Sequence, residues 1–341
     1  MSNINSTNFK DTITSLITDV EHPLRYTGNE FNIIKKEPDN TPIKIGLAFP
    51  DLYDVGMGYY GLHILYHILN RDEFIAAERV FTPWPDFEEK LRENSFPLYT
   101  LENKIPLNRL DLLGFSLTYE LGHTNVLNML DLAEIPLWQK DRSNNDPLII
   151  AGGGSTYNPE PMAPFFDLYL IGDAEDKIVN IIKFVGTQKA KGIDRDQILY
   201  HLASKFECIY VPSLYSSESD EKFTLAIPKK PDIPKRIEAN KVTELKSDFY
   251  PEDPIIPLGH STQDRMIVEI MRGCTRGCRF CQAGMNYRPV RERTVDDIDN
   301  QIRQSLNQTG YSDISLLSLS TSDYNGLEQL IDSLSDIIIS L

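Results

Sequence analysis

The stretch 266–281, MIVEIMRGCTRGCRFC, places three cysteines directly after a run of apolar residues. Residues 266–271 have the length and composition of a buried strand, so the cysteines begin a loop at its carboxyl end. The thiols are Cys274, Cys278 and Cys281, in the spacing C-x3-C-x2-C. So tight a group of thiols on a loop indicates a metal site, because thiolates are soft ligands that suit iron–sulfur clusters and zinc.

The number of sulfur ligands separates two kinds of metal site. A structural zinc ion normally takes four protein ligands, whereas this loop offers three thiols and no histidine. Zinc would need Cys208 or a distant histidine as its fourth ligand, and a zinc-stabilised α/β binding module stays open on this ground. Three thiolates would instead leave one iron of a 4Fe–4S cube without a protein ligand, where a substrate or cofactor can coordinate.

A helix and a second strand are expected after the cysteine loop. Thr294 is a suitable N-cap, and apolar residues then recur at helical spacing as far as Gly310, which suits a helix end. Residues 314–319 (ISLLSL) predict the next strand, and a further apolar stripe predicts a helix from Leu327 to the end of the sequence.

The first half of the chain alternates short apolar runs with amphipathic segments. Helical spacing between the runs, clearest over 59–69, indicates stacked βαβ units around a parallel sheet. We therefore predict an α/β fold that begins with a flavodoxin-like, doubly wound parallel sheet, whose ligands bind at the carboxyl ends of the strands. The five expected strands are 43–49, 77–81, 112–117, 148–151 and 168–171.

Four segments are expected along the chain. Residues 1–42 form a lead-in, 43–190 the doubly wound domain and 261–341 the second α/β unit. Between them, 191–260 is predicted to be an extended linker, because proline disfavours both helix and interior strand and this segment contains IPKKPDIPKRIE and YPEDPIIPLGH. Within it, 209–215 and 223–227 could pair as strands.

The charge of the chain is strongly acidic except near the cysteines. A net charge of −16 argues against nucleic-acid binding over the whole surface. From Arg265 to Arg293, however, there are seven arginines and only two acids, Glu269 and Glu292. These arginines are either solvated surface or neighbours of an anionic cluster, cofactor or substrate; RNA is permitted but not established.

The amino terminus, MSNINSTNFKDTITSLITDV, is polar and lacks the basic start and apolar core of a secretory signal. No apolar run reaches the roughly 18 residues that a membrane span needs. We expect a cytoplasmic protein with no membrane partner.

The spacing of the three cysteines, with the aromatic Phe280 just before the last one, resembles the signature of the radical S-adenosylmethionine (SAM) superfamily. The wider resemblance covers about residues 20–341 and is to radical SAM proteins with an N-terminal cobalamin-binding-like domain, here 43–190. It implies that 261–341 is the start of a radical SAM (β/α) partial barrel. The matching runs are PDLYDVGMGYYGLHIL, AGGGSTYNPEP, DLYLIGDAE and RGCTRGCRFCQAGMNYRPVRERT.

The resemblance also implies a set of cofactors and ligands. The three cysteines would bind three irons of a 4Fe–4S cluster, and SAM would chelate the fourth iron. An electron donor such as flavodoxin or ferredoxin would reduce the cluster, and cleavage of SAM would give a 5′-deoxyadenosyl radical. No substrate or catalytic residue is implied. The residues expected at SAM are Phe280 beside the adenine, and Ser320, Ser322 and Asp323 after the second strand, where a plain helix cap is the alternative.

Cobalamin is a further cofactor to consider. Domains that bind it through histidine carry Asp-x-His-x-x-Gly after the first strand, and here that loop has Asp51, Tyr53 and Gly56. A neutral phenol is a poor cobalt ligand compared with imidazole. His63 and His67 lie beyond the loop and are expected to be ordinary helix residues. Either the fold holds cobalamin without a protein ligand or it does not hold it at all, so that cobalamin is possible but doubtful.

The sequence from Arg265 to Leu341 is enough for two barrel units and a little more, since a βα unit takes about 30 residues. The expectation is a C-terminally truncated barrel, completed by missing sequence or by a second polypeptide. Whether this chain alone is an enzyme stays open, with a truncated, non-catalytic cluster-binding remnant as the alternative.

Overall fold

The computed structural model describes residues 6–219, 224–259 and 261–340. Its main sheet has the strand order β2-β1-β3-β4-β5-β6, in which the first five strands are parallel and β6 is antiparallel to β5. The order 2-1-3-4-5 is that of flavodoxin-like domains, so the predicted fold is confirmed. The strands are β1 Ile43–Phe49, β2 Ile75–Phe81, β3 Leu112–Ser116, β4 Leu148–Gly152, β5 Leu168–Leu170 and β6 Ile209–Tyr210.

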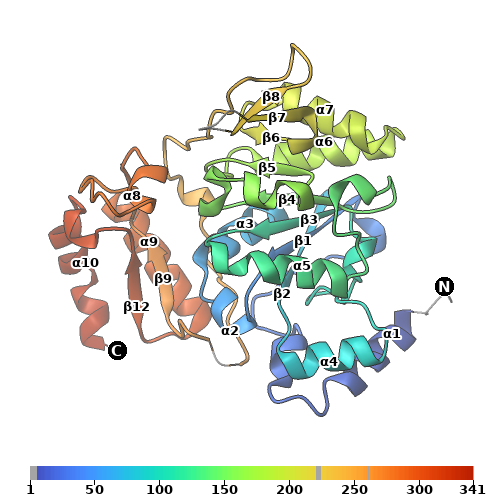
Figure 1. Cartoon of the computed structure of the whole chain (residues 1–341). Coiled ribbons are helices and arrows are strands. Elements are labelled where there is room, and N and C mark those ends of the chain that lie inside the picture. The colour runs from blue at the N-terminus through green and yellow to red at the C-terminus, as the bar shows by residue number, and fades with distance from the viewer. Residues whose placement is uncertain (1–5, 220–223, 260, 341) are drawn as a thin grey trace.

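Helices cover both faces of this sheet (Figure 1). Helices α3 (Tyr60–Arg71) and α6 (Ile178–Ala190) contact each other and β1, while α4 (Pro85–Glu93) contacts α5 (His123–Leu132). Because the strands are covered on both sides, their residues are largely buried: in β2, all seven residues are buried, including the charged pair Glu78 and Arg79.

The lead-in packs against the domain. Helix α1 (Ser6–Leu16) buries Phe9 and Ile13 in the main core, and the ring of Phe9 stacks on that of Phe96 with centroids 4.4 Å apart. Further along the lead-in, Glu30 forms a buried ion pair with Arg79 of β2 at 3.0 Å.

The segment 191–260 is not the uniformly extended linker that its prolines suggest. Helix α7 (Arg195–Lys205) lies within it, because Asp194 caps the helix by accepting a hydrogen bond from the Gln197 N–H and apolar side chains bury one face. Strand β6 then joins the main sheet, and β7 (Tyr215–Ser219) pairs with β8 (Thr224–Pro228) in an antiparallel hairpin. The extended character begins after β8, where the prolines lie. The four segment boundaries themselves stay predictions.

The second α/β unit has its own small core. Strand β9 (Met266–Glu269) pairs in parallel with β12 (Ile314–Leu317), and helices α9 (Val295–Thr309) and α10 (Leu327–Ser340) contact each other. Thr294 caps α9 by accepting a hydrogen bond from the Asp297 N–H, and Gly310 ends it with a φ of 70°. Both predicted helix ends are confirmed.

The second unit lies beside the doubly wound domain, next to α3 (Figure 1). Gln301 of α9 joins the two, because its amide donates to the Tyr60 hydroxyl of α3 at 2.9 Å. Within the described parts of the chain, we find no helix with the length and apolarity that crossing a bilayer requires. The cytoplasmic location stays a prediction.

Candidate iron–sulfur site and interdomain cavity

A cavity of about 390 Å³ lies where the two α/β units meet. Its volume falls within the range of small-molecule sites, roughly 300–1,000 Å³. One wall is a face of the main sheet, where the register sets Leu47, Gly114 and Ile150 side by side, and Ile64 of α3 also lines it. The second unit contributes another wall, made by Glu269, Met271, Arg272, Gly273, Tyr287, Leu317, Ser318 and Leu319. The cavity is thus mainly apolar inside.

The glycine run after β4 serves two purposes. Gly153 has a φ of 105°, and a Cβ there would lie 2.6 Å from the carbonyl oxygen of Leu117, so the turn requires glycine. A Cβ on Gly152 would meet no atom within 4 Å, and Gly152 lines the cavity. The tight turn therefore explains Gly153, whereas Gly152 leaves space for a ligand beside the strand.

The cysteine loop leaves the sheet through a short stem next to this cavity. Strand β10 (Met271–Arg272) leads into the loop and β11 (Arg291–Glu292) leads out, and the two pair antiparallel. Cys274 is buried, Cys281 half-buried and Cys278 exposed. Helix α8 (Ala283–Asn286) lies within the loop.

The donor chemistry of the loop fits an iron–sulfur cluster. Two of the sulfurs already accept weak hydrogen bonds from backbone N–H groups: Cys274 Sγ from Arg276 at 3.4 Å and Cys281 Sγ from Gly284 at 3.3 Å. Hydrogen bonds to the ligand sulfurs are a typical feature of protein iron–sulfur sites. Among the described residues, no three His, Cys, Asp or Glu side chains are arranged to hold a metal ion. The ligand role of the three cysteines stays a prediction.

The residues expected at SAM lie around the cysteine loop in different ways. Asp323 is bonded by Arg276, which stands between the first two cysteines, with Nε 2.6 Å from Oδ2. Ser320 also donates to Asp323, at 2.7 Å, and both contacts lower the pKa of this carboxyl. Ser322 is exposed in the short 3-10 turn Thr321–Asp323, and Phe280 is 92% exposed. The structure thus brings the end of β12 to the cysteine loop, while the contact of these residues with SAM remains a prediction.

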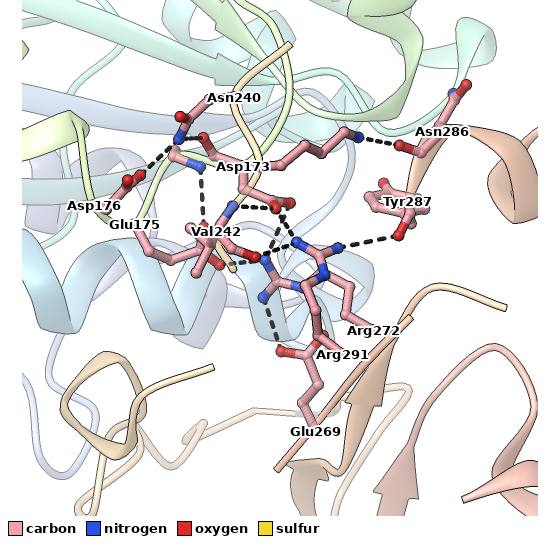
Figure 2. Close-up of polar contacts among 12 residues, drawn as sticks. Asp173, Glu175, Asp176, Asn240, Val242, Glu269, Arg272, Asn286, Tyr287 and Arg291 are labelled. Atoms are coloured by element: carbon pink, nitrogen blue, oxygen red, sulfur yellow. Dashed lines mark hydrogen bonds and ion pairs between the residues drawn. The ribbon is translucent and has the colours of Figure 1, made fainter. Parts of the chain in front are cut away.

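A buried network of charges joins the loop stem to the doubly wound domain (Figure 2). Arg272 of β10 forms ion pairs with Glu175 at 2.6 Å, with Glu269 at 2.8 Å and with Asp173 at 3.2 Å. Burial alone would lower the pKa of Arg272, but the facing carboxylates raise it well above its ordinary value. Arg291 of β11 also pairs with Asp173.

Several arginines of this segment are therefore paired with other groups of the protein. Arg293 is also buried, where it donates to the Gln301 side chain at 2.6 Å and lies over the Tyr250 ring. Arg279 and Arg288 are exposed. Of the two interpretations of this segment, neither solvated surface nor a free anion site describes Arg272, Arg291 and Arg293. Arg272 and Arg291 join the two units through their ion pairs with Asp173.

Tyr53, at the position of the cobalt ligand, faces the core. It begins the short helix α2 (Tyr53–Gly56), is 2% exposed and packs its ring against Phe81 at 5.4 Å. His63 bonds the carbonyl of Met57 at 2.9 Å from within α3, where it was expected to be an ordinary helix residue. Among the described residues that line the cavity there is no histidine. These residues do not fit a histidine-ligated cobalamin.

Sequence reasoning missed the carboxylates that hold the loop stem. Asp173 and Glu175 follow β5 closely, within the run DLYLIGDAE, and acids after a parallel strand mark the ligand edge of such a sheet. Tyr157 and Lys241 were missed as well. The Tyr157 hydroxyl donates to the carbonyl of Asn286 in the cysteine loop at 3.1 Å and accepts from Lys241 at 2.7 Å.

Comparison with protein families assigns both halves of the chain to one class. Residues 61–212 match the family model described as radical SAM proteins, N-terminal. Residues 268–340, which include the cysteine loop, match the radical SAM superfamily. The chain is a radical SAM protein whose N-terminal region has a flavodoxin-like fold.

Individual relatives are distant. The chain is 24% identical over 295 residues to MJ0966, an uncharacterized protein of Methanocaldococcus jannaschii. The aligned residues cover 86% of this chain and 52% of MJ0966. A tRNA-2-methylthio-N(6)-dimethylallyladenosine synthase of Clostridium botulinum is 29% identical over 124 residues, 35% of this chain and 25% of its own.

A solved structure with a similar arrangement is the radical SAM methyltransferase TsrM of Kitasatospora setae, with tryptophan and a SAM analogue bound. It gives a TM-score of 0.47 at 13% identity, over 87% of this chain and 51% of TsrM. The chain spans about half the length of MJ0966 and TsrM.

Proposed function

We propose that this protein binds a 4Fe–4S cluster and SAM, and directs a 5′-deoxyadenosyl radical at a group held in the interdomain cavity. Cys274, Cys278 and Cys281 would hold three irons, and the fourth would be left for SAM. The observation that carries the proposal is the shared wall: Arg272 and Gly273, directly before Cys274, line the cavity. When bound, the cluster would supply the electron that cleaves SAM.

The residues of the chain would position the reactants and exclude water. The sheet face and α3 give the cavity an aliphatic lining, and Gly152 leaves room against the backbone. The charged side chains at the cavity, Asp173, Glu175, Glu269 and Arg272, are paired with one another. A site of this kind is suited to radical chemistry, in which the cofactor reacts and the protein orients it and excludes competing reactions.

Reductive cleavage of SAM separates an enzyme from a remnant that only binds a cluster. Protein reconstituted anaerobically with iron and sulfide, then given dithionite and SAM, should form 5′-deoxyadenosine in an amount that rises with protein concentration. A chain that carries the cluster and releases no 5′-deoxyadenosine above a protein-free control would be the remnant instead.

The cavity residues lead us to propose that cobalamin is not an obligatory cofactor. Tyr53 is turned into the core against Phe81, and the loop in which it stands offers no imidazole. Protein produced with hydroxocobalamin in excess should carry far less than one corrin per chain after gel filtration, as measured by its visible absorption. Stoichiometric corrin would refute this part of the proposal.

Two kinds of protein partner are proposed. Among the described strands, β12 pairs only with β9, and Leu317, Leu319 and Ile331 are 41–51% exposed. An uncovered parallel strand edge of this kind favours further pairing, and we propose that additional βα units cover it, from the same polypeptide or from a second one. An electron donor such as flavodoxin or ferredoxin would approach exposed Cys278, where Arg279 and Arg288 are also exposed.

A further inference from the structure

The cysteine loop is a closed loop with a single stem. Residues 273–290 lie between β10 and β11, and the ladder sets Arg272 directly opposite Arg291. Both arginines point from the stem toward the doubly wound domain (Figure 2). Besides the bond from Tyr157 to Asn286, the contacts of these two side chains therefore help to set the position of the loop relative to that domain.

One carboxylate contacts both sides of the stem. Asp173, which is 6% exposed, places one oxygen 3.2 Å from Nη1 of Arg272, and its other oxygen accepts from Nη1 of Arg291. The second oxygen also accepts from the backbone N–H of Val242 at 3.0 Å. Asn240 fixes the Asp173 backbone. Its side-chain amide donates to the Asp173 carbonyl at 2.8 Å, and its own carbonyl accepts from the Asp173 N–H at 2.9 Å. These bonds join the turn after β5 to the segment that leads to the second unit.

The two arginines do not depend equally on Asp173. Arg272 keeps Glu175 and Glu269 as further partners. The other described acceptors of Arg291 are backbone carbonyl oxygens, of Val242 at 2.7 Å, Tyr287 at 3.0 Å and Pro289 at 3.1 Å. Among the described contacts of buried Arg291, Asp173 is therefore the group that supplies a neutralising charge, and a buried guanidinium without one is strongly disfavoured.

The same residues also form part of the cavity wall. Asp173 and Arg272 both line the cavity, and Cys274 follows two residues after Arg272. We infer that Asp173 is a positioning residue: by bonding both sides of the stem it fixes the distance and orientation of the cysteine loop relative to the interdomain cavity. The fixed position of the loop follows from the ion pairs, whereas its consequence for the placement of the cluster rests on the proposed function.

The test is Asp173→Asn, which keeps the size of the side chain and removes its charge. In the purified protein without added cofactors, backbone amide hydrogen exchange across 273–290 should become faster by about tenfold or more, because charged hydrogen bonds to the stem are lost. In the reconstituted and reduced variant, the electron paramagnetic resonance signal of the cluster after addition of SAM should be broader than in the wild type, or split into more than one species. Asp131→Asn is the matched control, since it removes an exposed ion pair with Arg92 and should change neither readout.

The outcomes are distinct. Unchanged exchange over 273–290 in Asp173→Asn would overturn the inference outright. Faster exchange with a spectrum identical to the wild type would also overturn it, because the carboxylate would then stabilise the loop without positioning the cluster. If the single variant fails to fold, Asp173→Asn combined with Arg291→Gln removes the unpaired charge and should still show the faster exchange. If the wild type itself binds no cluster, the proposed function fails while the exchange measurement still tests the fixed loop.

Discussion

A larger side chain at position 152, which would fill part of the cavity, should raise the stability of the protein and lower its activity. Gly152 is the last residue of β4, lines the cavity and would present a Cβ to open space. In Gly152→Val, the three added carbons would enter the open space of the mainly apolar cavity, and complete burial of each would contribute about 0.8 kcal/mol. Loss of the glycine also lowers the conformational entropy of the unfolded chain, which stabilises the folded protein by about 0.4–1 kcal/mol.

Together these two effects stabilise the folded protein by at most about 3 kcal/mol. The conformational entropy that the new side chain loses on folding lowers this value. We therefore expect the free energy of unfolding in urea to rise by about 1–2 kcal/mol. At the same time, any reaction that depends on a ligand in the cavity should fall by at least about tenfold, since 1.4 kcal/mol of lost binding suffices for that. Product formation from reductively cleaved SAM, with the natural substrate supplied by a cell extract, measures the second effect.

The control for Gly152→Val is Ser217→Val, which adds a β-branched side chain to exposed strand β7, outside the residues that line the cavity. It should leave activity unchanged. A stable Gly152→Val protein with full activity would refute the view that the cavity holds the reacting group. A Gly152→Val protein that is less stable than the wild type would show that the space beside β4 is not open.

Two further predictions concern the stability of the doubly wound domain. Arg79→Met should destabilise it by about 3–5 kcal/mol, because Glu30 and Glu102 would lose their shared buried cation; urea unfolding measures this, and a loss below 1 kcal/mol would contradict it. Burial lowers the pKa of His63 to about 4, against about 6.5 when unfolded, so the stability it contributes is present above pH 6.5 and is lost as the pH falls toward 4. From pH 7.5 to 5, protonation of His63 should lower the free energy of unfolding of the wild type by about 2 kcal/mol. His63→Gln should therefore lose about 2 kcal/mol less stability than the wild type over the same range. Equal losses would show that His63 is not the cause.

The doubly wound domain could be predicted from sequence because its strands are buried on both faces. Such strands appear as short continuous apolar runs, and Ile43–Phe49 is predicted to the residue. The lead-in was harder to predict, although Phe9, Ile13 and Leu16 already have helical spacing, because nothing local shows that a short amphipathic segment will find a surface to cover. In 191–260, the apolar residues of α7 do have helical spacing, but the prolines after β8 favour an extended segment and are the stronger local signal.

The candidate site could be predicted only in part. The three cysteines are adjacent in sequence, so their spacing is informative. Asp173, in contrast, meets Arg272 and Arg291 across 99 and 118 positions of the chain. No periodicity or motif spacing records a pairing at that distance, and the excess of arginines therefore looked like surface or an anion site. Asp323 was placed near SAM on resemblance, but its ion pair with Arg276 could not be foreseen.

The most direct test of the central claim is the iron and sulfide content of matched cysteine variants. After anaerobic reconstitution, the wild type and Cys208→Ser should each hold about four irons and four sulfides per chain, whereas Cys278→Ser should hold far less of both. Cys208 is buried in the core of the doubly wound domain, away from the loop that would carry the cluster. Bound zinc without sulfide in the wild type, lost on replacing Cys208, would contradict the account and establish a structural zinc site in its place.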